Sequence, residues 1–244
     1  MKKLVLSVVC AAASLVCFAD SAEENLKKAE EFYDSGNYEQ AAKFCRKAAE
    51  QGNAEAQCKL GVCYSNGYGV EKNFDEALKW YRKAADQGEA SAQLNIGMRY
   101  ESGDGVEKNI EEAAKWYRKS AEQGNAYAQY FLGCLYYYGK GVERDYAEAV
   151  KWFRKADGQG NAPAQVLLGF CHLLGNGVEK NWDEALKFYR KAADQGDAWG
   201  QFFLGQCYHY GRCVEKNLDE AKKWYRKAAD QGNENAIQAL KKLQ

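Results

Sequence analysis

The chain has 244 residues, with 34 basic and 34 acidic side chains, 46% hydrophobic residues and a single proline. The even charge balance argues against a nucleic-acid-binding protein, which needs a basic excess to displace counterions from phosphates. The hydrophobic content is too high for a disordered chain.

The N-terminal segment, residues 1–19, has the pattern of a secretion signal. Lys2 and Lys3 precede an apolar run from Leu4 to Phe18, followed by Ala19. This run is shorter than the roughly 20 residues that span a bilayer as a helix. We expect cleavage after Ala19 and a bacterial, periplasmic or secreted product with no membrane span in the mature chain. An uncleaved membrane anchor is the alternative.

Glycines recur along the rest of the chain with a spacing of 36 residues. One series comprises Gly52, Gly88, Gly124, Gly160, Gly196 and Gly232, and a second comprises Gly61, Gly97, Gly133, Gly169 and Gly205. Two further series begin at Gly67 and Gly69. A fixed period between 20 and 50 residues is typical of stacked-repeat proteins.

Each period predicts two helices. In the repeat 53–88, apolar and small residues from Ala54 to Tyr64 recur at helical spacing, and Gly67 ends the helix. Asn73 is the expected N-cap of a second helix, which ends before Gly88. The mid-helix glycines are unfavourable by about 1 kcal/mol relative to Ala unless a neighbouring helix must approach closely.

These units give the expected domain organisation of an all-α protein. A shorter capping repeat occupies 20–52, and a C-terminal capping helix occupies 233–244. Between them, over 53–232, lie five repeats at 53–88, 89–124, 125–160, 161–196 and 197–232.

The motif A-x-x-Q-x-x-L-G-x-x-Y-x-x-G-x-G-V, followed by A-x-x-W-Y-x-x-A-A-x-x-G, resembles the SEL-one-like repeat of the tetratricopeptide-like superfamily. The resemblance implies a right-handed α/α solenoid whose first helices line a concave groove. It also implies a non-enzymatic adaptor that binds a protein or peptide. We expect a monomer that needs no cofactor.

Comparison of the repeats with one another predicts where the partner binds. Positions that differ between repeats lie opposite the Leu-Gly-Tyr stripe of the first helix, and they become aromatic or aliphatic after residue 125. Exposed apolar patches of this kind mark interaction sites. Packing of the same side chains as additional core is the alternative. The predicted groove residues are Tyr127, Tyr130, Phe131, Tyr137, Tyr138, Phe170, Leu174, Trp199, Phe202, Phe203, His209 and Tyr210.

Two other functions remain open at this point. A secreted, cysteine-rich subgroup of the resembled family is linked to β-lactam binding and hydrolysis, but its paired cysteines correspond to Ala85 and Gln93 here. A concave aromatic wall also suits carbohydrate, although the wall is poor in Asp, Asn and Arg. His172 and His209 are the two histidines, and no familiar catalytic motif contains them.

Seven cysteines follow the expected signal peptide, an odd number that leaves at least one unpaired. Cys45 and Cys58 flank Gly52 at similar distances and are the best disulfide candidate, with Cys207 and Cys213 a weaker pair. No C-x-x-C motif occurs, so we expect no zinc site.

The second helices carry a basic strip, represented by Lys79, Arg82 and Lys83. Asp75 and Asp86 stand four residues from members of this strip, which predicts pairs worth about 0.3–0.5 kcal/mol each. We interpret the basic strip as a solvated outer face of the second helices. The alternative is that it binds acidic lipid or polysaccharide.

Overall fold

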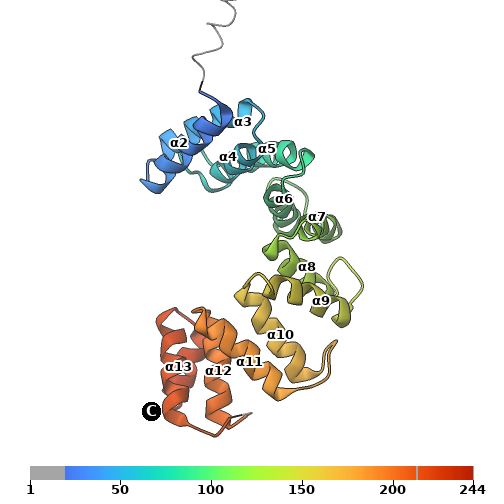
Figure 1. Ribbon diagram of the computed structural model, residues 1–244, viewed down its shortest axis with the longest axis vertical. Coiled ribbons are helices and arrows are strands. Elements are labelled where there is room, and N and C mark those ends of the chain that lie inside the picture. Colours follow the sequence, from blue (N-terminus) through green and yellow to red (C-terminus); the bar gives the residue numbers. More distant parts are fainter. Residues whose placement is uncertain (1–19, 213, 244) are drawn as a thin grey trace, which may run out of the picture. The chain divides into compact units, whose positions relative to one another are not determined.

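The computed structural model describes residues 20–212 and 214–243, so the expected signal peptide lies outside the described residues. Within the described part, the chain forms thirteen α-helices and no strand (Figure 1). The predicted all-α fold is confirmed. No helix in these ranges is long and apolar enough to cross a bilayer.

The helices alternate between first and second members of hairpins. The first helices are α2 (Ala22–Asp34), α4 (Ala54–Asn66), α6 (Ala90–Ser102), α8 (Ala126–Tyr138), α10 (Ala162–Leu174) and α12 (Ala198–Tyr210). The second helices are α3 (Tyr38–Glu50), α5 (Phe74–Asp86), α7 (Ile110–Glu122), α9 (Tyr146–Asp157), α11 (Trp182–Asp194) and α13 (Leu218–Asp230). The terminal helix α14 (Glu234–Lys241) packs on α13.

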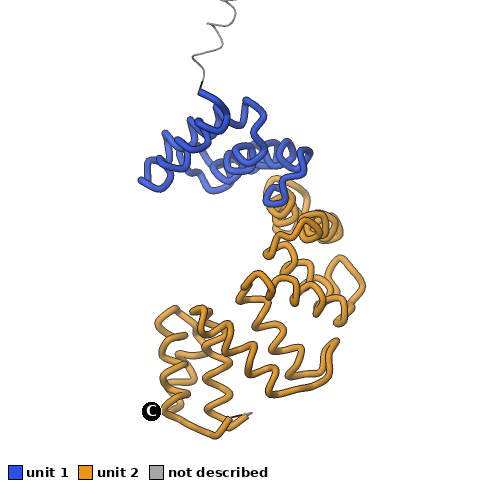
Figure 2. Tube along the Cα trace, in the orientation of Figure 1, with its two compact units in different colours: residues 1–92 blue, residues 93–244 orange. Residues whose placement is uncertain are grey.

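The chain divides into two compact units, residues 1–92 and 93–244, which Figure 2 colours separately. Helices α2–α5 belong to the first unit, and α7–α14 belong to the second. In both units each helix packs against the next one along the chain, so the core consists of successive layers between neighbouring helices.

Helix ends follow the predicted chemistry. The Asn53 side chain accepts a hydrogen bond from the Ala56 backbone N–H (2.8 Å), and Asn73 does the same for Glu76 (3.0 Å). Such caps satisfy amide groups that have no partner inside the helix. Gly67 ends α4 with φ +79°, a conformation that residues with a Cβ rarely adopt.

The mid-helix glycines lie under an aromatic ring of the following helix. A Cβ at Gly61 would be 2.5 Å from Cε1 of Tyr81, and one at Gly169 would be 2.4 Å from Cε1 of Tyr189. The same contact recurs for Gly97 with Tyr117, Gly133 with Phe153 and Gly205 with Tyr225. The predicted close approach of a neighbouring helix is therefore confirmed.

Each repeat contains a pair of hydrogen-bonded glutamines that the sequence analysis did not identify. In each repeat the amide nitrogen of the glutamine before the Gly turn donates to the amide oxygen of the glutamine 30 residues earlier. The pairs are Gln57–Gln87, Gln93–Gln123, Gln129–Gln159, Gln165–Gln195 and Gln201–Gln231, at 2.7–2.9 Å. Gln129 also donates to the carbonyl oxygen of Ala121 (3.1 Å), whereas the side-chain nitrogen of buried Gln165 has no such partner.

This difference gives a matched pair of substitutions. We expect Gln129→Leu to lower the free energy of unfolding by about 1–2 kcal/mol, because it removes hydrogen bonds to a buried carbonyl and to Gln159. Gln165→Leu should cost less, since it also removes an unsatisfied amide nitrogen. Chemical denaturation followed by circular dichroism would measure the free energy of unfolding of both variants. Equal losses of stability would contradict the difference in hydrogen bonding between Gln129 and Gln165.

Candidate functional site

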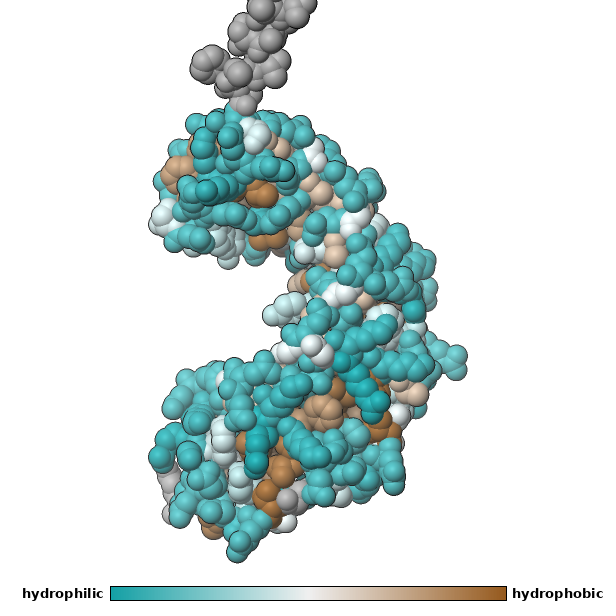
Figure 3. Space-filling view, viewed as in Figure 1, coloured by the Kyte–Doolittle hydropathy of each residue, from teal (hydrophilic) through white to brown (hydrophobic). Residues whose placement is uncertain are grey.

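The candidate site lies in the second unit, on the surface formed by the first helices α8, α10 and α12, here called the first-helix face. Figure 3 shows apolar residues gathered over the part of this unit that contains α10–α12. The predicted groove residues of this face divide into half-buried, buried and exposed groups.

Half-buried rings extend the core toward the first-helix face. Phe131 stacks on buried Tyr117 with ring centroids 5.3 Å apart. Phe203 lies 5.3 Å from the Tyr189 ring and 4.6 Å from the Phe170 ring. The predicted residues in this group are Tyr130, Phe131, Tyr137, Phe170 and Phe203. These rings support the face from beneath, in line with the alternative of core packing.

Phe202 is a correction to the predicted groove. It is 7% exposed and packs in one core cluster with Tyr225 and Ala236. Val166 at the same repeat position is also buried, at 6%. Variation between repeats at this position therefore reflects differences in the space to be filled beside the next helix, and it is no sign of ligand contact.

Three exposed apolar side chains form what we call the exposed row, at the last residue of each first helix of this face. Tyr138, Leu174 and Tyr210 are 55%, 57% and 56% exposed. Each is followed by a glycine in the left-handed conformation, which turns the backbone away and leaves the side chain outside. Tyr127 and Trp199 are also exposed, at the other end of α8 and α12.

Polar groups that the sequence analysis missed flank the exposed row. The Lys140 ammonium lies 5.6 Å from the Tyr138 ring centroid, and the Arg212 guanidinium lies 5.2 Å from that of Tyr210. Asn176 donates to the Tyr137 hydroxyl at 3.0 Å, which links the end of α8 to the loop after α10. All three polar residues directly follow the C-terminal glycine of a first helix. Their shared position in the repeat could have identified them from the sequence.

His209 serves the core as well as the face. Its Nδ1 lies 3.3 Å from the hydroxyl of Tyr225, and its ring stacks on Tyr210. The equivalent residue three repeats earlier, Glu101, accepts a hydrogen bond from the Tyr117 hydroxyl at 2.5 Å. In these two repeats, the residue at this position therefore contacts the hydroxyl of a core tyrosine.

His209 should make stability depend on pH. Burial, aided by Lys216, lowers the pKa of His209 below its ordinary value. The unfolded chain therefore binds this proton more readily, and the contribution of neutral His209 is lost as the pH falls from about 7 through the folded-state pKa. The melting temperature of the wild type should fall more between about pH 7 and pH 5 than that of His209→Gln. An identical pH dependence of the two proteins would contradict this.

The other histidine is a core residue. His172 is 8% exposed and stacks on Phe188, with centroids 5.6 Å apart. It occupies the position at which Tyr136 and Tyr208 accept hydrogen bonds from Arg118 and Arg190. Among the described residues, no three His, Cys, Asp or Glu side chains are grouped so as to hold a metal ion.

The structure contains no disulfide between Cys45 and Cys58, the pair that the sequence predicted. The Cys45 sulfur lies 3.2 Å from the carbonyl oxygen of Ala56 and beside the thiol of Cys63. Ala56 and Cys63 are seven residues apart and share a face of α4, whereas Cys58 lies roughly 140° around the helix from Cys63. Residues at similar sequence distances from Gly52 lie at a similar level along the two helices, but that spacing does not show which way each side chain points.

In the basic strip, Lys79 is paired, although not with the expected Asp75. Lys79 binds Glu76, three residues earlier, at 2.5 Å, in place of Asp75. The Lys83 ammonium lies 4.0 Å from the Trp80 ring centroid. Both arrangements recur in the second unit, with Lys187–Glu184 and Lys155–Trp152 as examples. The pattern is that of a solvated helix surface.

Comparison with known proteins identifies these repeats. The family model described as "Sel1 repeat" matches residues 31–53, 54–89, 90–125, 126–160, 162–197 and 200–233. No curated protein matches the chain.

Several solved structures are similar. A Sel1 repeat protein from Oxalobacter formigenes is 40% identical with a TM-score of 0.83, over 88% of this chain and 86% of that one. A protective antigen with an SLR fold from uropathogenic Escherichia coli is 37% identical with a TM-score of 0.80; the match covers 90% of this chain but 48% of the antigen. An immunity protein from Pseudomonas aeruginosa, 24% identical with a TM-score of 0.57 over 85% of this chain and 83% of that one, shares the fold. The repeat pattern, the helical hairpins and these matches agree: the chain belongs to the Sel1 repeat family.

Proposed function

We propose that this protein is an exported, non-enzymatic scaffold that binds a protein or peptide segment on the first-helix face of its second unit. The Sel1 repeat fold suggests a protein-interaction scaffold. The exposed row supports the location of the binding surface. Its three apolar side chains remain more than half exposed at equivalent positions of consecutive repeats.

The half-buried rings make the first-helix face a firm contact surface. Their packing against Tyr117 and Tyr189 restricts the rotamers of the layer that a partner would touch. A partner that covers exposed aromatic side chains on such a layer buries roughly 150–250 Å² for each ring. Little conformational entropy is then lost on binding, which favours affinity.

The flanking cations define the chemistry of the partner further. Lys140 and Arg212 lie beside the first and last members of the exposed row. A segment with apolar anchors and an acidic side chain beside them would satisfy both the rings and the cations. Export rests on the pattern of residues 1–19, and a non-enzymatic role rests on the packing of both histidines against aromatic rings.

Photo-crosslinking tests the location of the site. Peptides selected from a random displayed library on the full chain would be bound to two variants that carry benzoylphenylalanine, at Leu174 on the first-helix face or at Lys187 on a second helix. We expect covalent capture at position 174 and little at 187. Capture at 187 alone, or a library that yields no binder, would contradict the proposal.

A further inference from the structure

The N-terminal repeat differs from the others at the position of the core aromatic residue. Cys45 stands where the later second helices carry Tyr81, Tyr117, Phe153, Tyr189 and Tyr225, each 36 residues apart. In those repeats the ring fills the space over the mid-helix glycine. A thiol is far smaller than a phenol ring, so the first repeat has room that the others lack.

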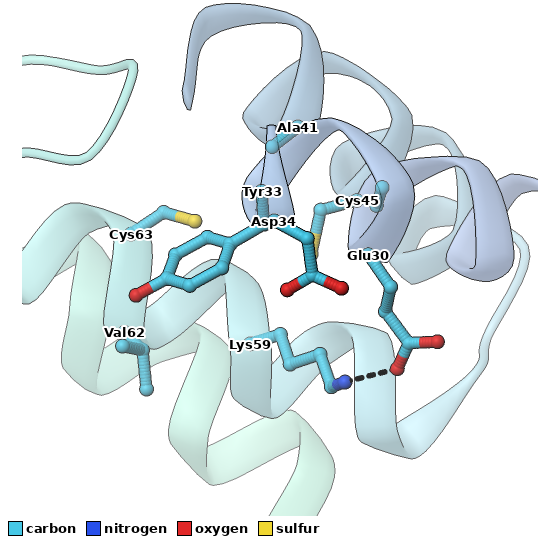
Figure 4. Close-up of a pocket in the computed structure, with 9 residues that line it drawn as sticks. Glu30, Tyr33, Asp34, Ala41, Cys45, Lys59, Val62 and Cys63 are labelled. Carbon is cyan, nitrogen blue, oxygen red and sulfur yellow. Dashed lines mark hydrogen bonds and ion pairs between the residues drawn. The ribbon is translucent and has the colours of Figure 1, made fainter. Parts of the chain in front are cut away.

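That room is seen as a cavity of about 440 Å³ between α2, α3 and α4. Its apolar wall includes Ala29, Ala41 and Val62, and both Cys45 and Cys63 line it (Figure 4). At its mouth Lys59 forms an ion pair with Glu30, as the dashed line in Figure 4 shows, and Tyr33 is 43% exposed. The cavity therefore gives a small solute access to two otherwise buried thiols.

The two thiols are neighbours on adjoining helices. Cys45 of α3 and Cys63 of α4 belong to one core cluster and are 2% and 6% exposed. The Cys45 thiol lies 3.2 Å from the Ala56 carbonyl oxygen, so it already reaches the face of α4 that Cys63 shares. The hydrogen bond from Cys45 lowers the pKa of the Cys63 thiol, and the same bond, together with burial, raises the pKa of Cys45. Cys63 is thus the better nucleophile of the pair.

The second unit provides internal controls for this geometry. Cys171 and Cys207 occupy the same repeat position as Cys63 and are also buried. At the position of Cys45, however, their clusters contain Phe153 and Tyr189. A thiol at this first-helix position meets a ring in those repeats and a second thiol in the N-terminal one.

We propose that Cys45 and Cys63 are a redox-active pair that forms a disulfide, which fastens the N-terminal hairpin α2–α3 to α4. With glutathione disulfide as the oxidant, the Cys63 thiolate attacks one sulfur and releases one glutathione, leaving a mixed disulfide on Cys63. The Cys45 thiolate then attacks the Cys63 sulfur and expels the second glutathione. The protein loses two protons and two electrons, and one glutathione disulfide becomes two glutathione molecules.

Tryptic mapping identifies the bond without ambiguity, because trypsin separates the relevant cysteines. Cys45 lies in the peptide 44–46, Cys58 in 48–59 and Cys63 in 60–72. The full chain would be equilibrated with oxidised glutathione, quenched in acid, alkylated in denaturant, digested and analysed by mass spectrometry. We expect peptide 44–46 linked to 60–72, with Cys171 and Cys207 alkylated.

Two variants and one stability measurement complete the test. Cys58→Ala should keep the link, and Cys45→Ala should leave Cys63 as a glutathione adduct. Oxidation should raise the melting temperature of the wild type by several degrees, because the bond closes a loop in the unfolded chain. A link between 44–46 and 48–59, or full alkylation of Cys45 and Cys63 in the oxidised wild type, would overturn the proposal.

Discussion

Gly169→Ala is expected to lower the free energy of unfolding by about 1–3 kcal/mol, the usual cost of overpacking a filled core. A Cβ at this position would lie 2.4 Å from Cε1 of Tyr189, whose ring is buried and held by Phe170 and Phe203. Helix propensity alone favours the opposite sign, because alanine is about 1 kcal/mol better than glycine within a helix. The sign of the change therefore decides whether packing or propensity governs this position.

Gly158→Ala is a matched control. Gly158 has a negative φ, and a Cβ there would meet Lys155 O at 3.4 Å, an ordinary contact. Urea denaturation of both variants should show a loss for Gly169→Ala and little change for Gly158→Ala. In addition, Gly169→Ala should cost less in a Tyr189→Ala background, because the ring is then absent. A stabilised Gly169→Ala protein would refute the packing argument.

The triple variant Tyr138→Ser, Leu174→Ser, Tyr210→Ser is expected to weaken binding of a selected peptide at least ~100-fold. Two anchor residues at about 2 kcal/mol each already exceed this loss. The melting temperature should change by only a few degrees, because the three side chains are 55–57% exposed. Isothermal titration calorimetry and thermal unfolding of the same samples measure both quantities.

The control replaces exposed charged residues of the second helices, with Lys115, Lys151 and Lys187 changed to serine. These side chains are 66%, 69% and 70% exposed and pair only with glutamates on their own helix among the ion pairs of the described chain. Peptide affinity should be retained in this protein. Equal losses in the two triple variants, or unchanged binding in the first, would show that the exposed row is not the docking surface.

Comparison of the repeats within this sequence identified the scaffold positions well. It was a poor guide to surface positions, because some variable positions lie in the core. Phe202 varies between repeats and is nevertheless core, because α13 and α14 cover it. His209 varies and is held by Tyr225. Side chains of different size or chemistry can fill equivalent interior spaces, so variation alone does not distinguish a free surface from a repacked interior.

The cysteines also show what sequence spacing cannot predict. Spacing from Gly52 correctly placed Cys45 opposite α4, yet it selected Cys58 over Cys63. The choice depends on the direction in which each side chain leaves its helix and on the space left by the missing ring at Cys45. Both properties belong to the packed hairpins.

The amino-acid sequence by itself determined the helical hairpin, its period of 36 residues, the caps and the glycines that admit a neighbouring ring, because these depend on local backbone chemistry repeated in every unit. The tertiary structure decided which apolar side chains stay exposed, which thiols meet and how the glutamines pair between helices. These outcomes depend on the distance and direction between side chains on different helices, which no local pattern encodes.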